Sequence, residues 1–117
     1  MEQLELSSLE KKLYEKMQWL EMKLSDQKEL VIEYADSEKT YRIALRIEML
    51  KAKSEGQAAT IISDLARGEK TVAELKWQRD VKKGTLDACK SAIESLQVEI
   101  SGFQTLISRH RAEMNLR

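Results

Sequence analysis

Few side chains of this sequence could carry out chemistry on a substrate. Cys89 is the only cysteine and His110 the only histidine. A catalytic nucleophile needs a base beside it, and a metal ion needs several ligands. Both residues instead fall on one apolar stripe of an expected helix, where a cysteine packs as a small hydrophobic residue. We therefore expect no catalytic residue, no metal site, no cofactor and no enzymatic activity.

Two further patterns could bind an ion or a phosphate. Glu29 and Glu33 lie one helical turn apart, but two carboxylates on an exposed helix face are usually solvated. The residues from Gly68 to Thr71 resemble the end of a phosphate-binding loop, which requires Gly-Lys-Ser/Thr in a row and an earlier glycine. Here Glu69 separates the glycine from the lysine. We interpret this segment as a helix end followed by a new helix start.

A basic tract surrounds Trp77. Residues 67–90 contain seven basic and four acidic residues, a net charge of +3. Basic residues next to an aromatic ring can hold phosphates while the ring stacks on a base. The candidate nucleic-acid contacts are Lys76, Arg79, Lys82 and Lys83. An acidic protein partner and an ordinary solvated face remain alternatives, because acids are interspersed in the tract.

The elements that carry these residues are helices. The 117 residues include no proline, whereas proline makes up about 5% of an average chain. Proline breaks helices because it lacks an N–H and clashes with the preceding turn. Charged residues make up 34% of the chain and aromatic residues 5%, a composition typical of long helices. The sequence predicts an all-α fold in a single domain, residues 1–117.

Three helices are expected, at about residues 7–54, 58–67 and 69–114. Ser7 or Ser8 would cap the first, and Gly56 would end it in the left-handed conformation. Thr60 would cap the short second helix, and Gly68 would end it. The first helix carries an apolar stripe with gaps of three, four and seven residues. Its members are Leu6, Leu9, Leu13, Met17, Leu20, Leu24, Val31, Tyr34, Tyr41, Leu45, Met49 and Ala52.

The last helix is heptad in its second half. The seam residues there are Leu86, Cys89, Ile93, Leu96, Ile100, Phe103, Ile107, His110 and Met114. In its first half Leu75 keeps the register, Arg79 and Lys82 occupy the next seam positions, and Val72 would lie on another face.

The two long helices match in length, which favours an antiparallel hairpin with the short helix at its elbow. That arrangement sets an acidic start beside a basic end. The charges concerned are Glu2, Glu5, Glu10 and Glu15 at the start, and Arg109, Arg111 and Arg117 at the end.

A second stripe on the first helix exceeds what a two-helix seam can bury. It holds Trp19, Met22, Ile32, Ile43, Ile47 and Leu50. In a lone hairpin these side chains, and Trp77, would stay in water. We expect a second copy of the chain to cover them in a helical bundle, with a different protein as the alternative. The candidate partner-binding residues are Trp19, Met22, Ile32 and Trp77.

The charge is balanced overall, with 20 basic and 20 acidic residues. Strong non-specific attraction of the whole molecule to nucleic acid or to membranes is therefore not expected. No run of 18 apolar residues is present, so we expect no membrane span. The lone cysteine fits a reducing compartment, and we expect the protein in the cytoplasm of a host cell.

Parts of the sequence resemble small uncharacterised helical proteins of Gram-positive phages and prophages. The similar stretches are Tyr34–Lys51, Glu55–Gly68, Ser95–Glu99 and Gln104–Ser108. The resemblance covers about residues 34–113, and the elbow is its most specific part. It implies a phage context near recombination and replication genes, and it supplies no catalytic residues.

The leading functional expectation is a non-enzymatic phage accessory protein. It would bind a host replication, nuclease or defence component through a helical surface and inhibit or adapt it. The alternative is a nucleic-acid-binding factor for recombination or single-strand annealing that uses the tract around Trp77. A third possibility is a coiled-coil structural element, which would assemble in an open-ended way.

Overall fold

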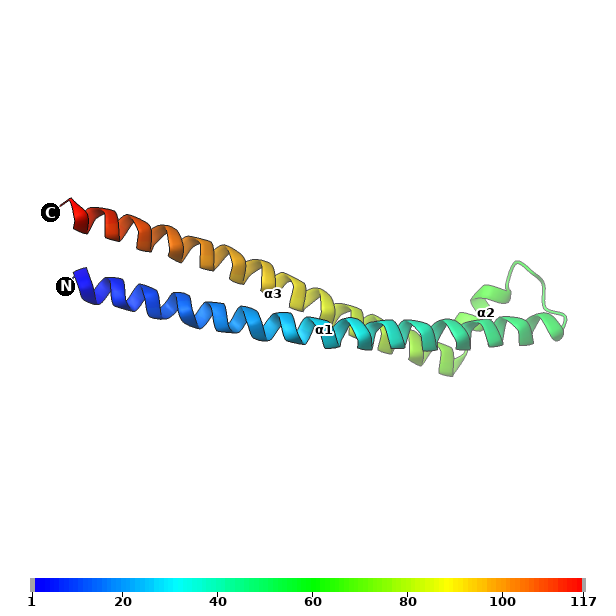
Figure 1. Cartoon of the computed structure of the whole chain (residues 1–117). Helices are drawn as coiled ribbons and strands as arrows, with labels where there is room; N and C mark the ends of the chain where they lie inside the picture. Colours follow the sequence, from blue (N-terminus) through cyan, green and yellow to red (C-terminus); the bar gives the residue numbers. More distant parts are fainter. Residues whose placement is uncertain (1, 117) are drawn as a thin grey trace. The chain divides into compact units, whose positions relative to one another are not determined.

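The computed structural model contains three helices and no strand within residues 2–116, the part of the chain that it describes (Figure 1). They are α1 (Glu2–Ser54), α2 (Ile62–Gly68) and α3 (Lys70–Asn115). The expected all-α helical hairpin is therefore confirmed. Nothing is described of Met1, of Arg117 or of the side chain of Glu2.

The glycine after α1, Gly56, adopts the left-handed conformation that the sequence predicts. Gly56 has a φ of 80°, a left-handed conformation that costs glycine little because it has no Cβ. The Gly56 N–H donates to the Lys53 carbonyl at 3.1 Å, and the Gln57 N–H donates to the Ala52 carbonyl at 3.2 Å. This pair of hydrogen bonds is a Schellman motif.

Two expected helix starts are wrong. The structure begins α1 at Glu2, so Ser7 and Ser8 lie inside the helix and do not cap it. It begins α2 at Ile62, with Ile61 at the cap position and no side-chain cap, so Thr60 does not cap that helix.

The start of α3 does have a side-chain cap. The carboxylate of Glu69 accepts a hydrogen bond from the Val72 N–H at 2.9 Å. That bond lowers the pKa of Glu69.

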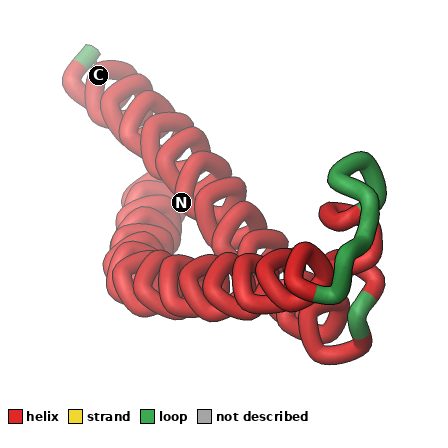
Figure 2. Tube along the Cα trace, turned by 90° about the vertical axis from the view of Figure 1, so that its right-hand side faces the viewer, coloured by secondary structure: helices red, strands yellow, loops and turns green. Residues whose placement is uncertain are grey.

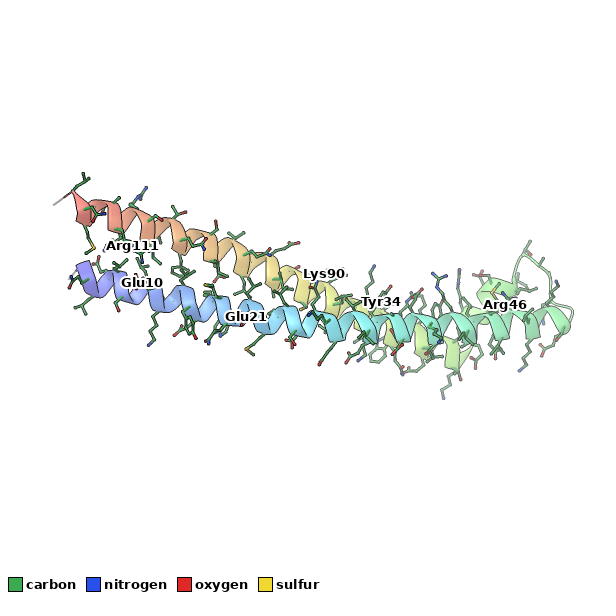
Figure 3. The ribbon with its side chains drawn as sticks, viewed as in Figure 1. Glu10, Glu21, Tyr34, Arg46, Lys90 and Arg111 are labelled. Atoms are coloured by element: carbon green, nitrogen blue, oxygen red, sulfur yellow. The ribbon has the colours of Figure 1, made fainter. Side chains whose placement is uncertain are left out.

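The contacts of the chain divide into two compact units, each built from part of α1 and part of α3. Unit 1 comprises residues 1–27 and 88–117, and unit 2 comprises residues 28–87. The two long helices run antiparallel in unit 1. Lys16 pairs with Glu99 at 2.7 Å and Glu10 with Arg111 at 2.8 Å, so residues early in α1 meet residues late in α3 (Figure 3). Within the described residues, the acidic start of α1 therefore lies beside the basic end of α3, as the sequence predicts.

One seam forms the core of unit 1. The buried side chains come from α3: Cys89, Ile93, Leu96 and Ile107. Their partners on α1 are only half-buried: Leu6, Leu9, Leu13, Lys16 and Leu20. Met17 and Leu24, which we expected on the seam, are exposed. The α1 seam follows the strict three-four heptad spacing from Leu13, and that spacing selects Lys16 over Met17.

The second unit repeats the antiparallel pairing and adds α2. Lys82 of α3 pairs with Glu33 of α1 at 3.1 Å, and Arg79 pairs with Glu38 at 3.2 Å. The short helix α2 follows a loop after α1, and a second, shorter loop joins it to α3 (Figure 2). The buried side chains of this unit are Tyr41, Ala52, Ala66, Val72 and Leu86.

The seam of α3 in unit 2 corrects one expectation. Val72 is only 1% exposed, so it lies on the seam and not on another face. Leu75, Arg79 and Lys82 are half-buried and continue the three-four spacing to Leu86. Trp77 and Val81 are exposed. The heptad of α3 thus extends from Val72 to Met114, and polar residues occupy part of it.

Truncation of a seam leucine tests whether this single stripe holds the helices together. Leu96→Ala should lower the free energy of unfolding by about 2 to 3 kcal/mol, because it removes buried methyl groups and leaves a cavity. The matched control is Val98→Ala, two residues away and exposed, which should cost less than about 0.5 kcal/mol. Urea unfolding followed by circular dichroism measures both. Equal losses of unfolding free energy in the two variants would contradict the conclusion that this stripe holds the helices together.

Candidate protein-binding surfaces

Trp19 and Met22 form an exposed apolar pair on unit 1. They lie three residues apart on α1, so their side chains are neighbours on one face. Trp19 is 54% exposed and Met22 64% exposed. The ammonium of Lys16 lies 4.7 Å from the centroid of the Trp19 ring and also pairs with Glu99. This cation–π contact therefore restrains the indole at the edge of the seam, while most of the indole surface faces water.

The other two candidate anchors lie in unit 2 and do not form a patch with each other. Ile32 and Trp77 are each 62% exposed. Each occupies the heptad position farthest from the seam of its own helix, so Ile32 points away from α3 and Trp77 away from α1. The structure thus brings Trp19 and Met22 together and separates Ile32 from Trp77.

Three of the seven basic residues of the tract around Trp77 form ion pairs. Lys76 lies 3.4 Å from Asp80, and Lys82 pairs with Glu33 across the seam. Arg79 contacts Asp80 at 2.9 Å and Glu38 at 3.2 Å, and its guanidinium lies 4.6 Å from the centroid of the Tyr41 ring. Three of the four candidate phosphate ligands therefore already have carboxylate partners, which reduces the positive charge that they offer to a nucleic acid. Lys83 is exposed.

Glu38 is the carboxylate at the centre of this network. The hydrogen bond from Arg42 lowers the pKa of Glu38 most, and the charge of Arg79 adds to the effect. A hydrogen bond from Arg79 likewise lowers the pKa of Asp80. Hence both carboxylates stay ionised to lower pH than usual, and the charge of Arg79 stays compensated.

The two residues considered for catalysis or metal binding, Cys89 and His110, each contact a residue of α1 across the seam. Cys89 is buried, and its thiol donates to the Lys23 carbonyl at 3.4 Å. His110 is half-buried, and its Nε2 lies 3.5 Å from a carboxylate oxygen of Glu5. Within residues 2–116, no cluster of three or more His, Cys, Asp or Glu side chains is placed to hold a metal ion.

A feature that the sequence did not reveal is a groove at the elbow, in unit 2. This elbow groove lies between residues 42–53 of α1 and Ile62 and Ser63 of α2, and its volume is about 920 Å³. Leu45, Met49 and Leu50 are its apolar α1 residues. The only advance sign was Leu50, a member of the second apolar stripe, which lines the groove and is 55% exposed.

A smaller pocket of about 310 Å³ lies on another face of α1 at the elbow. Its charged residues are Glu48, Lys51, Glu55 and Glu69. Since three of these four are acidic, the two hollows differ in charge: the elbow groove has basic side chains and the smaller pocket mainly acidic ones.

Comparisons with known proteins add no family to these observations. No protein-family model matches the chain, and no curated protein or solved structure matches it either. Among the described residues, no helix is both long enough and apolar enough to cross a membrane.

The lowered pKa of Glu38 predicts a loss of stability in acid. A carboxylate whose pKa is lower in the folded than in the unfolded chain stabilises the fold above its ordinary pKa. That contribution is lost as the pH falls below the ordinary glutamate pKa of 4.5 and through the lowered folded pKa. We expect the free energy of unfolding of Glu38→Gln to decrease less steeply with falling pH than that of the parent chain. Urea unfolding between pH 3 and 7 tests this, and identical slopes would contradict it.

The engaged cations predict weak nucleic-acid binding. We expect the full chain to bind a single-stranded oligonucleotide with a Kd no tighter than about 1 µM at 0.15 M salt, as for non-specific binding. Lys83→Glu should remove most of this binding, and Lys28→Glu should not. Fluorescence anisotropy at several salt concentrations provides the measurement. Tighter binding that survives Lys83→Glu would show that another surface holds the nucleic acid.

Proposed function

We propose that this chain is a non-enzymatic phage accessory protein that binds another protein through a helical surface. The observation that carries the proposal is the exposure of Trp19 and Met22 side by side on α1. Buried aromatic side chains contribute much of the binding energy at protein interfaces. An exposed tryptophan that is already held by Lys16 loses little conformational entropy when a partner covers it.

The phage context of the proposal comes from the resemblance of residues 34–113 described above. In that context the partner is a host replication, nuclease or defence component in the host cytoplasm, which the chain inhibits or adapts. A second copy of the chain is a further partner for the same surface, in a closed dimer. Nucleic-acid binding is the less favoured function because Arg79 and Lys82 already pair with carboxylates.

Truncation of the tryptophan tests the proposal. Trp19→Ala should weaken association with the partner, or with a second copy, at least tenfold. Helix content should stay nearly unchanged, because the ring is mostly exposed. Capture of partners from a host lysate, read by mass spectrometry with and without nuclease, measures the first. Sedimentation and circular dichroism of the purified chain measure self-association and helix content.

The matched control is Val98→Ala, which removes an exposed apolar side chain from α3 in the same unit. A nuclease-resistant partner that Val98→Ala retains and Trp19→Ala loses would support the proposal. Unchanged capture and unchanged sedimentation in Trp19→Ala would refute it. Loss of every partner on nuclease treatment would instead favour a nucleic-acid function.

A further inference from the structure

The elbow groove has the form of a binding site for a helix. One wall is α1, where Leu45 and Met49 lie one turn apart, and the other is α2, which contributes Ile62. All three side chains are half-buried, while Leu50 at the edge is 55% exposed. A ridge of apolar side chains spaced by three and four residues can enter such a groove, as in known helix-in-groove complexes. Met49 adds adaptability, since its thioether chain has several rotatable bonds.

The charges around the groove are of one sign. Arg42, Arg46 and Lys53 line it, and no acidic residue does so. Their spacing of four and seven residues sets all three on one side of α1. Arg42 already donates to Glu38, whereas Arg46 and Lys53 are exposed. The groove therefore combines an apolar floor with a basic rim.

We propose that the elbow groove binds an amphipathic helical segment of a partner protein that carries acidic residues beside its apolar face. The apolar anchors would cover Met49, Leu50 and Ile62, and the acids would meet Arg46 and Lys53. A nucleic acid fits less well because the lining residues include no aromatic side chain on which a base could stack. A membrane surface fits less well because the site is concave.

This inference adds a second surface to the proposed function and does not depend on it. The Trp19 and Met22 pair belongs to unit 1, and the elbow groove belongs to unit 2. A chain that loses one of these activities can therefore keep the other. Trp19→Ala should leave binding at the elbow groove unchanged.

The probe for the test is a designed fluorescent peptide with leucines at i, i+3, i+4 and i+7 and glutamates at the flanking positions. We expect the full-length chain to bind it with micromolar affinity, measured by anisotropy. A peptide with lysine in place of each glutamate should bind at least tenfold more weakly. Since charge contributes to the contact, raising the salt from 0.05 M to 0.5 M should weaken the glutamate peptide severalfold.

Two pairs of variants locate the binding. Arg46→Glu should weaken the glutamate peptide at least tenfold, whereas Lys28→Glu should not, because Lys28 lies about 27 Å away along α1. Leu50→Ser should weaken the peptide about fivefold, whereas Ile32→Ser should not. Leu50 and Ile32 are both more than half exposed, so neither change should unfold the chain, and circular dichroism checks this.

Three results would overturn the proposal. The first is equal binding of the glutamate and lysine peptides, or no binding of either. The second is binding that is unchanged in both Arg46→Glu and Leu50→Ser. The third is a different occupant: phosphatidylglycerol vesicles that bind where the peptide does not, or a dimer that Leu50→Ser dissociates without any peptide binding.

Discussion

A pair of helices can bury only one stripe of each partner, and this constraint governs the molecule. The stripe of α3 repeats every three and four residues from Val72 to Met114, and it includes every buried residue of that helix. A two-helix core has no third layer to cover the flanks. Large apolar residues beyond the seam, such as Trp19, Met22 and Ile32, therefore remain exposed to water.

The same seam explains the ion pairs. Lys16, Arg79 and Lys82 occupy seam positions where a stable coiled coil would place leucine or isoleucine. Each pairs with a glutamate on the facing helix. Polar seam residues cost stability but disfavour shifted pairings, because a shift would leave their charges without partners. Leu96 and its neighbours on the apolar seam therefore stabilise the antiparallel register more than these charges do, because partly exposed ion pairs contribute only about 0–1 kcal/mol each.

These two properties connect the fold with the proposed binding. A thin core leaves apolar flanks exposed, and the ion pairs of the polar seam residues match the antiparallel register while those flanks remain available. In unit 2 the short helix α2 closes part of the α1 surface, so that a flat flank becomes a groove. The charge of the groove follows from α1 alone, since Arg42, Arg46 and Lys53 recur on one side of that helix.

The sequence by itself determined the helices, the left-handed end at Gly56 and the antiparallel pairing, because these follow from local backbone preference and from periodicity. It also identified Trp19 and Met22 as surplus to the seam. Only the tertiary structure decided that Lys16, rather than Met17, lies on the seam, that Val72 is buried and that Arg79 and Lys82 meet glutamates of α1. It alone revealed the elbow groove. These features depend on how α2 and α3 pack against α1. The spacing of apolar residues allowed Met17 as well as Lys16 on the seam, and the pattern of one helix does not say which side chain of another helix it meets.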